Sequence, residues 1–208
     1  MRHKIGIAKV GTVLAIAALG LFATGSASAG LLFTAPASEC NPETTQAFED
    51  WGDTALYRLV PGGTFESGVA SWSLSGGAKV VSGNEPFGVV PGTRSLLLPA
   101  GATATSPTMC FGFGDWHTRF FVRNTGSTSA RLEVDVIAKN LLGLVSVLDG
   151  GVVRADGTWD PSPEVSALLT NVGGLLGTTK AVSFRLKASG TGAQFQLDNV
   201  FLDPLRKD

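Results

Sequence analysis

The stretch Pro61-Gly62-Gly63-Thr64-Phe65-Glu66-Ser67-Gly68, with Trp72 shortly after it, decides the fold that we expect for this chain. Its residues are those of an opening β-strand, with residues 64–65 extended. Near the other end lies the run Gln196-Leu197-Asp198-Asn199-Val200, which places an aspartate among apolar residues. We predict that the two ends of a β-sandwich meet here, with Glu66 facing Asp198 in an acidic pocket.

Short runs of alternating apolar and polar residues continue from Gly63 to the C-terminal region, separated by Gly, Pro, Asn and Ser. Such runs at this spacing are typical of an antiparallel sandwich or barrel. The further strands that they predict cover residues 72–74, 78–82, 95–98, 102–105, 118–123, 130–139, 144–153, 181–188 and 193–202. One short helix is expected from Pro163, because Val165, Leu168, Leu169 and Val172 follow a helical period.

The first 29 residues have the pattern of a secretory signal peptide. Three basic residues precede an apolar run that ends in Ala27-Ser28-Ala29, a typical cleavage site. The apolar run is too short to span a bilayer, so we expect cleavage, secretion and no membrane insertion afterwards. Residues 30–60 are then predicted to form an N-terminal arm, and residues 61–208 one sandwich domain.

Charge and cysteine content restrict the partners and the compartment. Without residues 1–29 the chain keeps 13 of its 16 basic residues and all 17 acidic ones, a formal charge of −4. This mild negative charge, without a basic run, argues against nucleic acid as a partner. In an oxidising compartment Cys40 and Cys110 are expected to form one disulfide that ties the arm to the domain. The bridge would close a loop of about 70 residues, worth roughly 4 kcal/mol.

Little in the sequence points to catalysis. His117 is the single histidine after residue 29, and the chain has no G-x-S-x-G, H-x-x-x-H or C-x-x-C pattern. Glu133 and Asp135 share one face of a predicted strand, roughly 7 Å apart. Paired carboxylates can hydrolyse glycosides, so a glycosidase stays as a remote alternative. We expect a protein that is not an enzyme.

Alternation places a polar lattice on the outside of the sandwich. Arg119, Phe121 and Arg123 share one face of their strand, as Glu133 and Asp135 do on theirs. Such a lattice is either a solvated surface of weak ion pairs or a shallow sugar-binding sheet with mixed donors and acceptors. Aromatic rings that could stack on sugars are Trp116, Phe87 and Phe121. These seven residues are the candidate ligand contacts.

Several motifs resemble carbohydrate-binding modules of the galactose-binding-like jelly-roll type. They are the opening run 62–68 with Trp72, the runs 75–77 and 80–83, and the closing run 195–202. The whole chain after residue 29 also resembles a group of uncharacterised secreted bacterial proteins, through Phe48-x-x-Trp51-Gly52-Asp53, residues 83–87 and Trp159-x-Pro161-Ser162-Pro163. The first resemblance implies an all-β jelly roll and a structural calcium held by Glu66 and Asp198.

The resemblance also implies a function. It predicts non-catalytic binding of an extracellular or cell-wall glycan, possible association with the cell wall, and calcium as the metal. Asn199 stands where the family often has a second acid, which leaves one charge fewer around the metal. The alternative is a structural or adhesive envelope protein that binds protein partners and no sugar.

Overall fold

The computed structural model describes residues 43–110, 117–139, 144–166 and 181–203. The chain divides into two units, Met1–Gly30 and Leu31–Asp208, and every described residue belongs to the second. Cys40 lies outside these ranges, so the Cys40–Cys110 disulfide stays a prediction. Within the described ranges, no helix has the length and hydropathy to cross a membrane.

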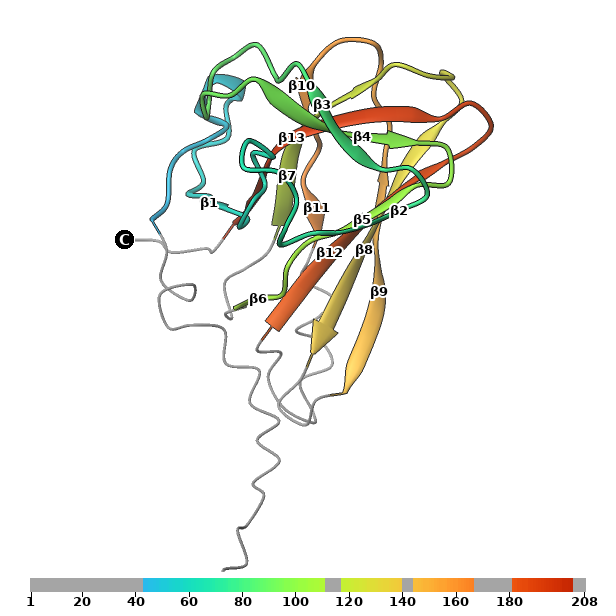
Figure 1. The fold of residues 1–208 in the computed structure, drawn as a ribbon. Helices are drawn as coiled ribbons and strands as arrows, with labels where there is room; N and C mark the ends of the chain where they lie inside the picture. The colour runs from blue at the N-terminus through green and yellow to red at the C-terminus, as the bar shows by residue number, and fades with distance from the viewer. Residues whose placement is uncertain (1–42, 111–116, 140–143, 167–180, 204–208) are drawn as a thin grey trace, which may run out of the picture. The chain divides into compact units, whose positions relative to one another are not determined.

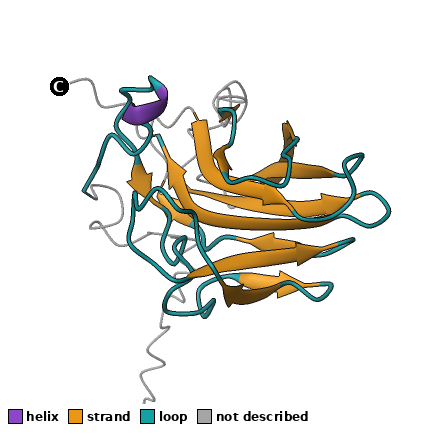
Figure 2. Cartoon of the chain, turned by 90° about the horizontal axis from the view of Figure 1, so that it is seen from above, coloured by secondary structure: helices purple, strands orange, loops and turns teal. Residues whose placement is uncertain are grey.

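Two antiparallel sheets make up the described part of the second unit (Figures 1 and 2). The seven-stranded sheet has the order β10-β7-β13-β4-β3, with β1 beside β13 and β11 beside β7. Its strands are β1 (Arg58–Leu59), β3 (Lys79–Ser82), β4 (Arg94–Pro99), β7 (His117–Asn124), β10 (Asp160–Pro161), β11 (Val165–Ser166) and β13 (Gln194–Leu202).

The second sheet has six strands in the order β2-β5-β12-β8-β9, with β6 beside β12. They are β2 (Ser73–Ser75), β5 (Thr103–Thr105), β6 (Met109–Cys110), β8 (Arg131–Lys139), β9 (Val145–Val153) and β12 (Ala181–Ser189). The expected all-β antiparallel sandwich is therefore confirmed.

Alternation along the strands builds the core between the sheets. Leu132, Val134 and Val136 of β8 and Phe120 and Val122 of β7 are buried in one apolar cluster. Burying each such side chain stabilises the fold by about 1.5–3 kcal/mol. The intervening residues point away from this core, so each sheet keeps an outer face.

An aromatic cluster lies on the outer face of the seven-stranded sheet. Phe48 stacks on Phe121 of β7 with ring centroids 5.3 Å apart, and it meets Phe201 of β13 edge-on at 5.5 Å. The segment that carries Phe48 continues through the 3-10 helix η1 (Glu49–Trp51) to the fully buried Tyr57. This segment shields part of the outer face from water.

Two local predictions are wrong. Residues 61–64 form turns, and Phe65 has a φ of 57°, so the opening stretch is not a strand. The expected helix fails at its start, because Val165 and Ser166 pair with Thr118 and His117 of β7. The remainder of that predicted helix lies outside the described residues.

The opening stretch nevertheless lies against β13, as expected. Val60 N–H donates to Val200 O (2.8 Å), and Val200 N–H donates to Gly63 O (3.1 Å). A Cβ at Gly63 would lie only 2.9 Å from Val200 O, so glycine permits this close approach. The pairing of β13 with β7 is irregular between Asp198 and Phe201, and Asn199 has a φ of 48°. This bulge is where the two ends of the fold meet.

Candidate functional site

A row of side chains crosses the outer face of the seven-stranded sheet. The strand register aligns Arg123 of β7, Gln196 of β13, Leu97 of β4 and Lys79 of β3. We call these four residues the cross-strand row. Lys79 is exposed and the other three are half-buried, whereas their neighbours along each strand face the core. The row therefore forms an open surface with an apolar floor at Leu97 and polar groups on both sides.

Arg123 is held in place within the row. Its Nε donates to Gln196 Oε1 at 2.7 Å, and its guanidinium carbon lies 5.0 Å from the centroid of the Trp159 ring. Nearby, the Thr125 hydroxyl donates to Gln194 Oε1 at 2.9 Å. These contacts place an indole, a guanidinium and two amides together, which is a mixed set of donors, acceptors and an aromatic group.

Aromatic rings border the row. Phe87 is 44% exposed, and its ring meets Trp51 at 4.9 Å and Phe121 at 5.5 Å. Phe121 itself is fully buried, because Phe48, Trp51 and Phe87 cover it. Its predicted role as an exposed ligand contact is therefore wrong, while Phe87 remains accessible.

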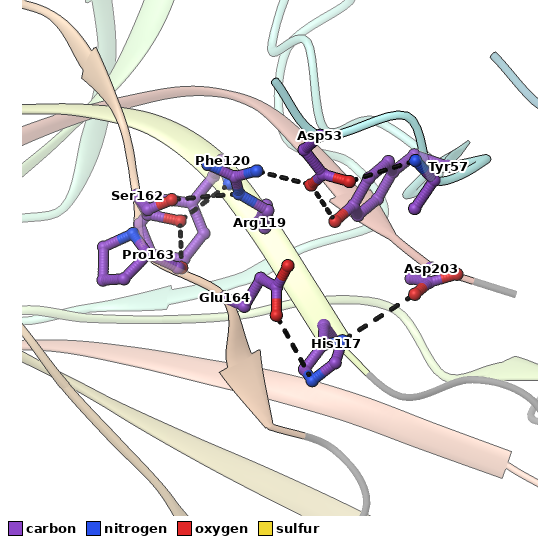
Figure 3. A network of polar contacts seen from close by, with 10 residues as sticks. Asp53, Tyr57, His117, Arg119, Phe120, Ser162, Pro163, Glu164 and Asp203 are labelled. Atoms are coloured by element: carbon purple, nitrogen blue, oxygen red, sulfur yellow. Dashed lines mark hydrogen bonds and ion pairs between the residues drawn. The ribbon is translucent and has the colours of Figure 1, made fainter. Parts of the chain in front are cut away.

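Arg119 is also unavailable to a ligand (Figure 3). The residue is only 9% exposed, and its Nη1 forms an ion pair with Asp53 Oδ2 at 2.5 Å. Its Nε donates to Ser162 O at 3.0 Å, and its guanidinium carbon lies 4.3 Å from the Phe48 ring centroid. Arg119 thus fixes the covering segment to β7, and the expectation that it contacts ligand is wrong.

Replacing Arg119 with Met should lower the free energy of unfolding by about 3 kcal/mol, because Asp53 would lose its buried cation. The matched control is Arg131→Met, since the Arg131 side chain is 53% exposed and its pair with Glu133 spans 3.7 Å. That exposed pair is worth at most about 1 kcal/mol. Urea denaturation measures both values, and equal losses would contradict the anchoring role.

His117 lies beyond Arg119 on the same strand, between two carboxylates. Its Nε2 is 3.6 Å from Glu164 Oε2, and its Nδ1 is 3.7 Å from Asp203 Oδ2 (Figure 3). The carboxylates approach different ring nitrogens from opposite sides, so they cannot share one metal ion with this ring.

Glu133 and Asp135 lie on the outer face of the other sheet, away from the cross-strand row. Lys187 Nζ donates to Glu133 Oε2 at 3.0 Å, and Arg185 Nη2 donates to Asp135 Oδ2 at 2.6 Å. The hydrogen bond from Lys187 lowers the pKa of Glu133. The structure therefore separates these two acids from Arg123, and basic partners on β12 hold both.

Asp198 lies at the bulge of β13, where the sequence predicts an acidic pocket. Asp198 is 2% exposed, and its carboxylate accepts hydrogen bonds from Glu85 N–H (3.1 Å) and Asn199 N–H (2.8 Å). Burial raises the pKa of Asp198 to about 7, and the neighbouring carboxylates of Glu85 and Glu66 act in the same direction. Glu66 accepts its own hydrogen bonds, from Thr93 and Arg94, so its facing of Asp198 stays a prediction.

Glu66 and Glu85 each accept hydrogen bonds from a separate set of donors. Burial alone would raise the pKa of Glu66, but hydrogen bonds from Thr93 and Arg94 outweigh it and lower that pKa. Glu85 is 1% exposed and accepts hydrogen bonds from Asn199 Nδ2 and from the backbone N–H groups of residues 87, 88 and 89. Glu85 therefore shapes the loop that carries Phe87.

The pocket offers hard oxygen ligands. Asn199 Oδ1 is buried and has no hydrogen-bond partner among the residues that the structure describes. Calcium prefers carboxylate and amide oxygens of this kind. No group of three or more His, Cys, Asp or Glu side chains converges closely enough to hold a metal within the described ranges. Calcium bound here would therefore take Glu66 and Asp198 together with neutral oxygens, for which Asn199 Oδ1 is suited.

The sequence patterns did not identify several residues of the candidate site. Trp159, Gln196, Lys79 and Glu85 were not assigned to a site, although alternation already turned Gln196 toward the same face as Arg123. The Asn84-Glu85-Pro86 turn was the available signal for Glu85. Trp116, the remaining predicted ligand contact, lies outside the described residues.

A scan against protein-family models finds no match, and neither does a search of curated proteins. Solved structures with a similar fold include a family 61 carbohydrate-binding module in complex with β-1,4-galactotriose. It has a TM-score of 0.47 and 15% identity, over 70% of this chain and 97% of that one. Another is a family 22 xylan-binding domain from Paenibacillus barcinonensis, with a TM-score of 0.47 and 16% identity, over 70% and 93%.

The enzymatically active domain of a bacteriophage CBA120 tailspike protein is similar as well. Its TM-score is 0.46 and its identity 13%, over 68% of this chain and 20% of that one. Carbohydrate-binding modules are thus among the solved structures to which the fold of this chain is similar. At these identities the likeness concerns the fold alone.

Proposed function

We propose that this protein is a secreted, non-catalytic glycan-binding module of the jelly-roll type, and that the cross-strand row is its binding surface. The observation that carries the proposal is the constellation of Arg123, Gln196 and Trp159 on an open sheet face. The exposed ring of Phe87 lies at the same outer face of the sheet.

The chemistry of the row suits a sugar. Pyranose hydroxyls both donate and accept hydrogen bonds, and an amide such as Gln196 offers both functions, while the guanidinium of Arg123 donates. The apolar side of a sugar ring packs well on an aromatic face, which Trp159 and Phe87 supply. Because Arg123 is already held by Gln196 and Trp159, little side-chain entropy is lost on binding.

Calcium is part of the proposal as a structural ion. Glu66 and Asp198 would hold it with Asn199 Oδ1, at the bulge where the opening stretch meets β13. A divalent cation there would offset the burial and the neighbouring negative charges that raise the pKa of Asp198. The ion would stabilise the junction and take no direct part in binding sugar.

Binding to a panel of extracellular and cell-wall polysaccharides, followed by titration of the best ligand, tests the proposal. Trp159→Ala and Gln196→Ala should each weaken binding about tenfold, equivalent to 1.4 kcal/mol. Thr103→Ala, on the outer face of the other sheet, should leave the affinity unchanged. Binding that persists in both variants would refute the cross-strand row as the site. If the wild type binds none of the glycans, the proposed function itself is refuted.

One observation favours the second candidate, a structural or adhesive envelope protein that binds a protein partner. Val145, Val147 and Val152 of β9 are 56%, 52% and 49% exposed, and β9 ends the strand order of its sheet. An exposed apolar edge strand commonly marks an interaction site. The two candidates can be separated by measuring how well the protein attaches to envelope material after periodate treatment, which oxidises glycans, or after protease treatment, which removes proteins. Loss after protease treatment alone supports the adhesive protein, and loss after periodate alone supports the glycan binder.

A further inference from the structure

In the described part of the chain, no carboxylate pairs with the positive charges of the cross-strand row. Within the described residues, Arg123 and Lys79 form no ion pair, although one is half-buried and the other exposed. The outer face of the six-stranded sheet is different, because Arg185, Lys187 and Arg131 there are each paired with Asp135 or Glu133. The two outer faces therefore differ in their charge balance.

The geometry of Arg123 leaves one side of its guanidinium available. Nε is used by Gln196, and the ring of Trp159 lies against the group, but the two terminal nitrogens have no hydrogen-bond partner among the described residues. Two terminal N–H groups form a planar fork that matches a carboxylate in a bidentate arrangement. A lysine in this position could not offer that fork.

The acids nearest in sequence to Trp159 are already engaged. Thr158 Oγ1 lies 2.5 Å from Asp156 Oδ1 and 3.0 Å from Asp160 Oδ2, and Thr158 N–H donates to Asp156 at 2.8 Å. Neither acid comes within ion-pair distance of Arg123 among the contacts of the described residues. The terminal nitrogens of Arg123 are therefore not taken up by any carboxylate of the described residues, which leaves them for an anionic ligand.

The row has a second cation at its far end. Three strand intervals separate Arg123 from Lys79, which places their backbones about 14 Å apart, with Gln196 and Leu97 between them. A linear polymer with repeated negative charges could therefore meet a cation at each end of the row. A polymer of neutral sugars would leave both cations without a counter-charge.

We infer that the cross-strand row selects an acidic glycan whose sugars carry carboxylates, that is, a uronic-acid polysaccharide. Arg123 binds one carboxylate through its terminal nitrogens, Lys79 attracts another, and Trp159 and Gln196 contact the sugar ring. This inference rests on the proposed glycan-binding function and adds the class of its ligand.

The test compares short oligogalacturonates with the same oligomers after complete methyl esterification, at constant calcium concentration. Esterification removes the charge and keeps the sugar backbone. The wild type should bind the acid form about tenfold more tightly than the ester, and sodium chloride should weaken that preference. Arg123→Gln should abolish the preference, while Arg123→Lys should restore it only in part. Lys187→Gln, on the other outer face, should change nothing.

Each outcome is decisive. Equal binding of acid and ester overturns the inference but leaves the glycan-binding function in place, whereas failure to bind any glycan refutes that function itself. Tighter binding of an equally charged sulfated oligosaccharide overturns the assignment to carboxylates. Loss of the acid preference in Lys187→Gln would move the site to the opposite face.

Discussion

Calcium is expected to raise the melting temperature of this protein by about 10 °C, and a chelator to reverse the gain. An ion present at about a thousand times its dissociation constant stabilises the folded state by roughly 4 kcal/mol. In a domain of this size each kcal/mol shifts the melting temperature by about 2–4 °C. Differential scanning calorimetry in calcium and in chelator measures the effect.

Without calcium, stability should fall as the pH rises from about 4 to about 7. Burial and two neighbouring carboxylates raise the pKa of Asp198 to about 7 in the folded state, from its ordinary value of 3.8. A raised pKa means that the folded chain binds its proton more tightly than the unfolded chain. The stabilisation is therefore complete below about pH 4 and is lost as the pH passes through 7. Calcium favours the ionised carboxylate and should remove this dependence.

Substitutions that keep the shape but remove the charge test the two acids of the proposed calcium site. Asp198→Asn should melt higher than the wild type in chelator at pH 8, because the cost of a buried charge is gone, and it should no longer respond to calcium. Glu66→Gln should also lose the response. Asp160→Asn, at an exposed position, is the control. Identical melting of the wild type in calcium and in chelator would show that the pocket binds no calcium.

The strands were predictable because their signal is local. Alternation located β8 and β12 to within one residue at each end, since one face of each sheet must be apolar. The two-residue strands β1, β6, β10 and β11 were missed because they are too short to show a period. The opening stretch was misassigned as a strand because its glycines permit turns, and the packing against β13 decides between the two conformations.

The site was predictable only in part, because a sequence does not show which faces are covered. Alternation correctly turned Arg123 outward, and it did the same for Phe121 and Arg119. Those two are buried by a segment about 70 residues earlier in the chain, which no local pattern reveals. The facing of Glu66 and Asp198 was expected from motif resemblance and stays a prediction, whereas the burial of Glu85 and its contact with Asp198 depend on long-range packing.

Replacing Glu85 with Ala is expected to lower the free energy of unfolding by about 5 kcal/mol. The carboxylate accepts hydrogen bonds from three backbone N–H groups and from Asn199 Nδ2, and the residue is 1% exposed. Each buried donor left without a partner costs about 1–3 kcal/mol. Urea denaturation measures the loss, with Glu49→Ala, an exposed glutamate in η1, as the matched control.

The same substitution should loosen the loop that carries Phe87 before it unfolds the sandwich. Amide hydrogen exchange at Phe87, Gly88 and Val89 should accelerate by more than exchange in the central strand β12, because Glu85 holds those three amides directly. Uniform acceleration throughout the protein would show that Glu85 supports only global stability. Unchanged exchange at the loop would contradict its role as the link between the acidic pocket and the aromatic border of the binding surface.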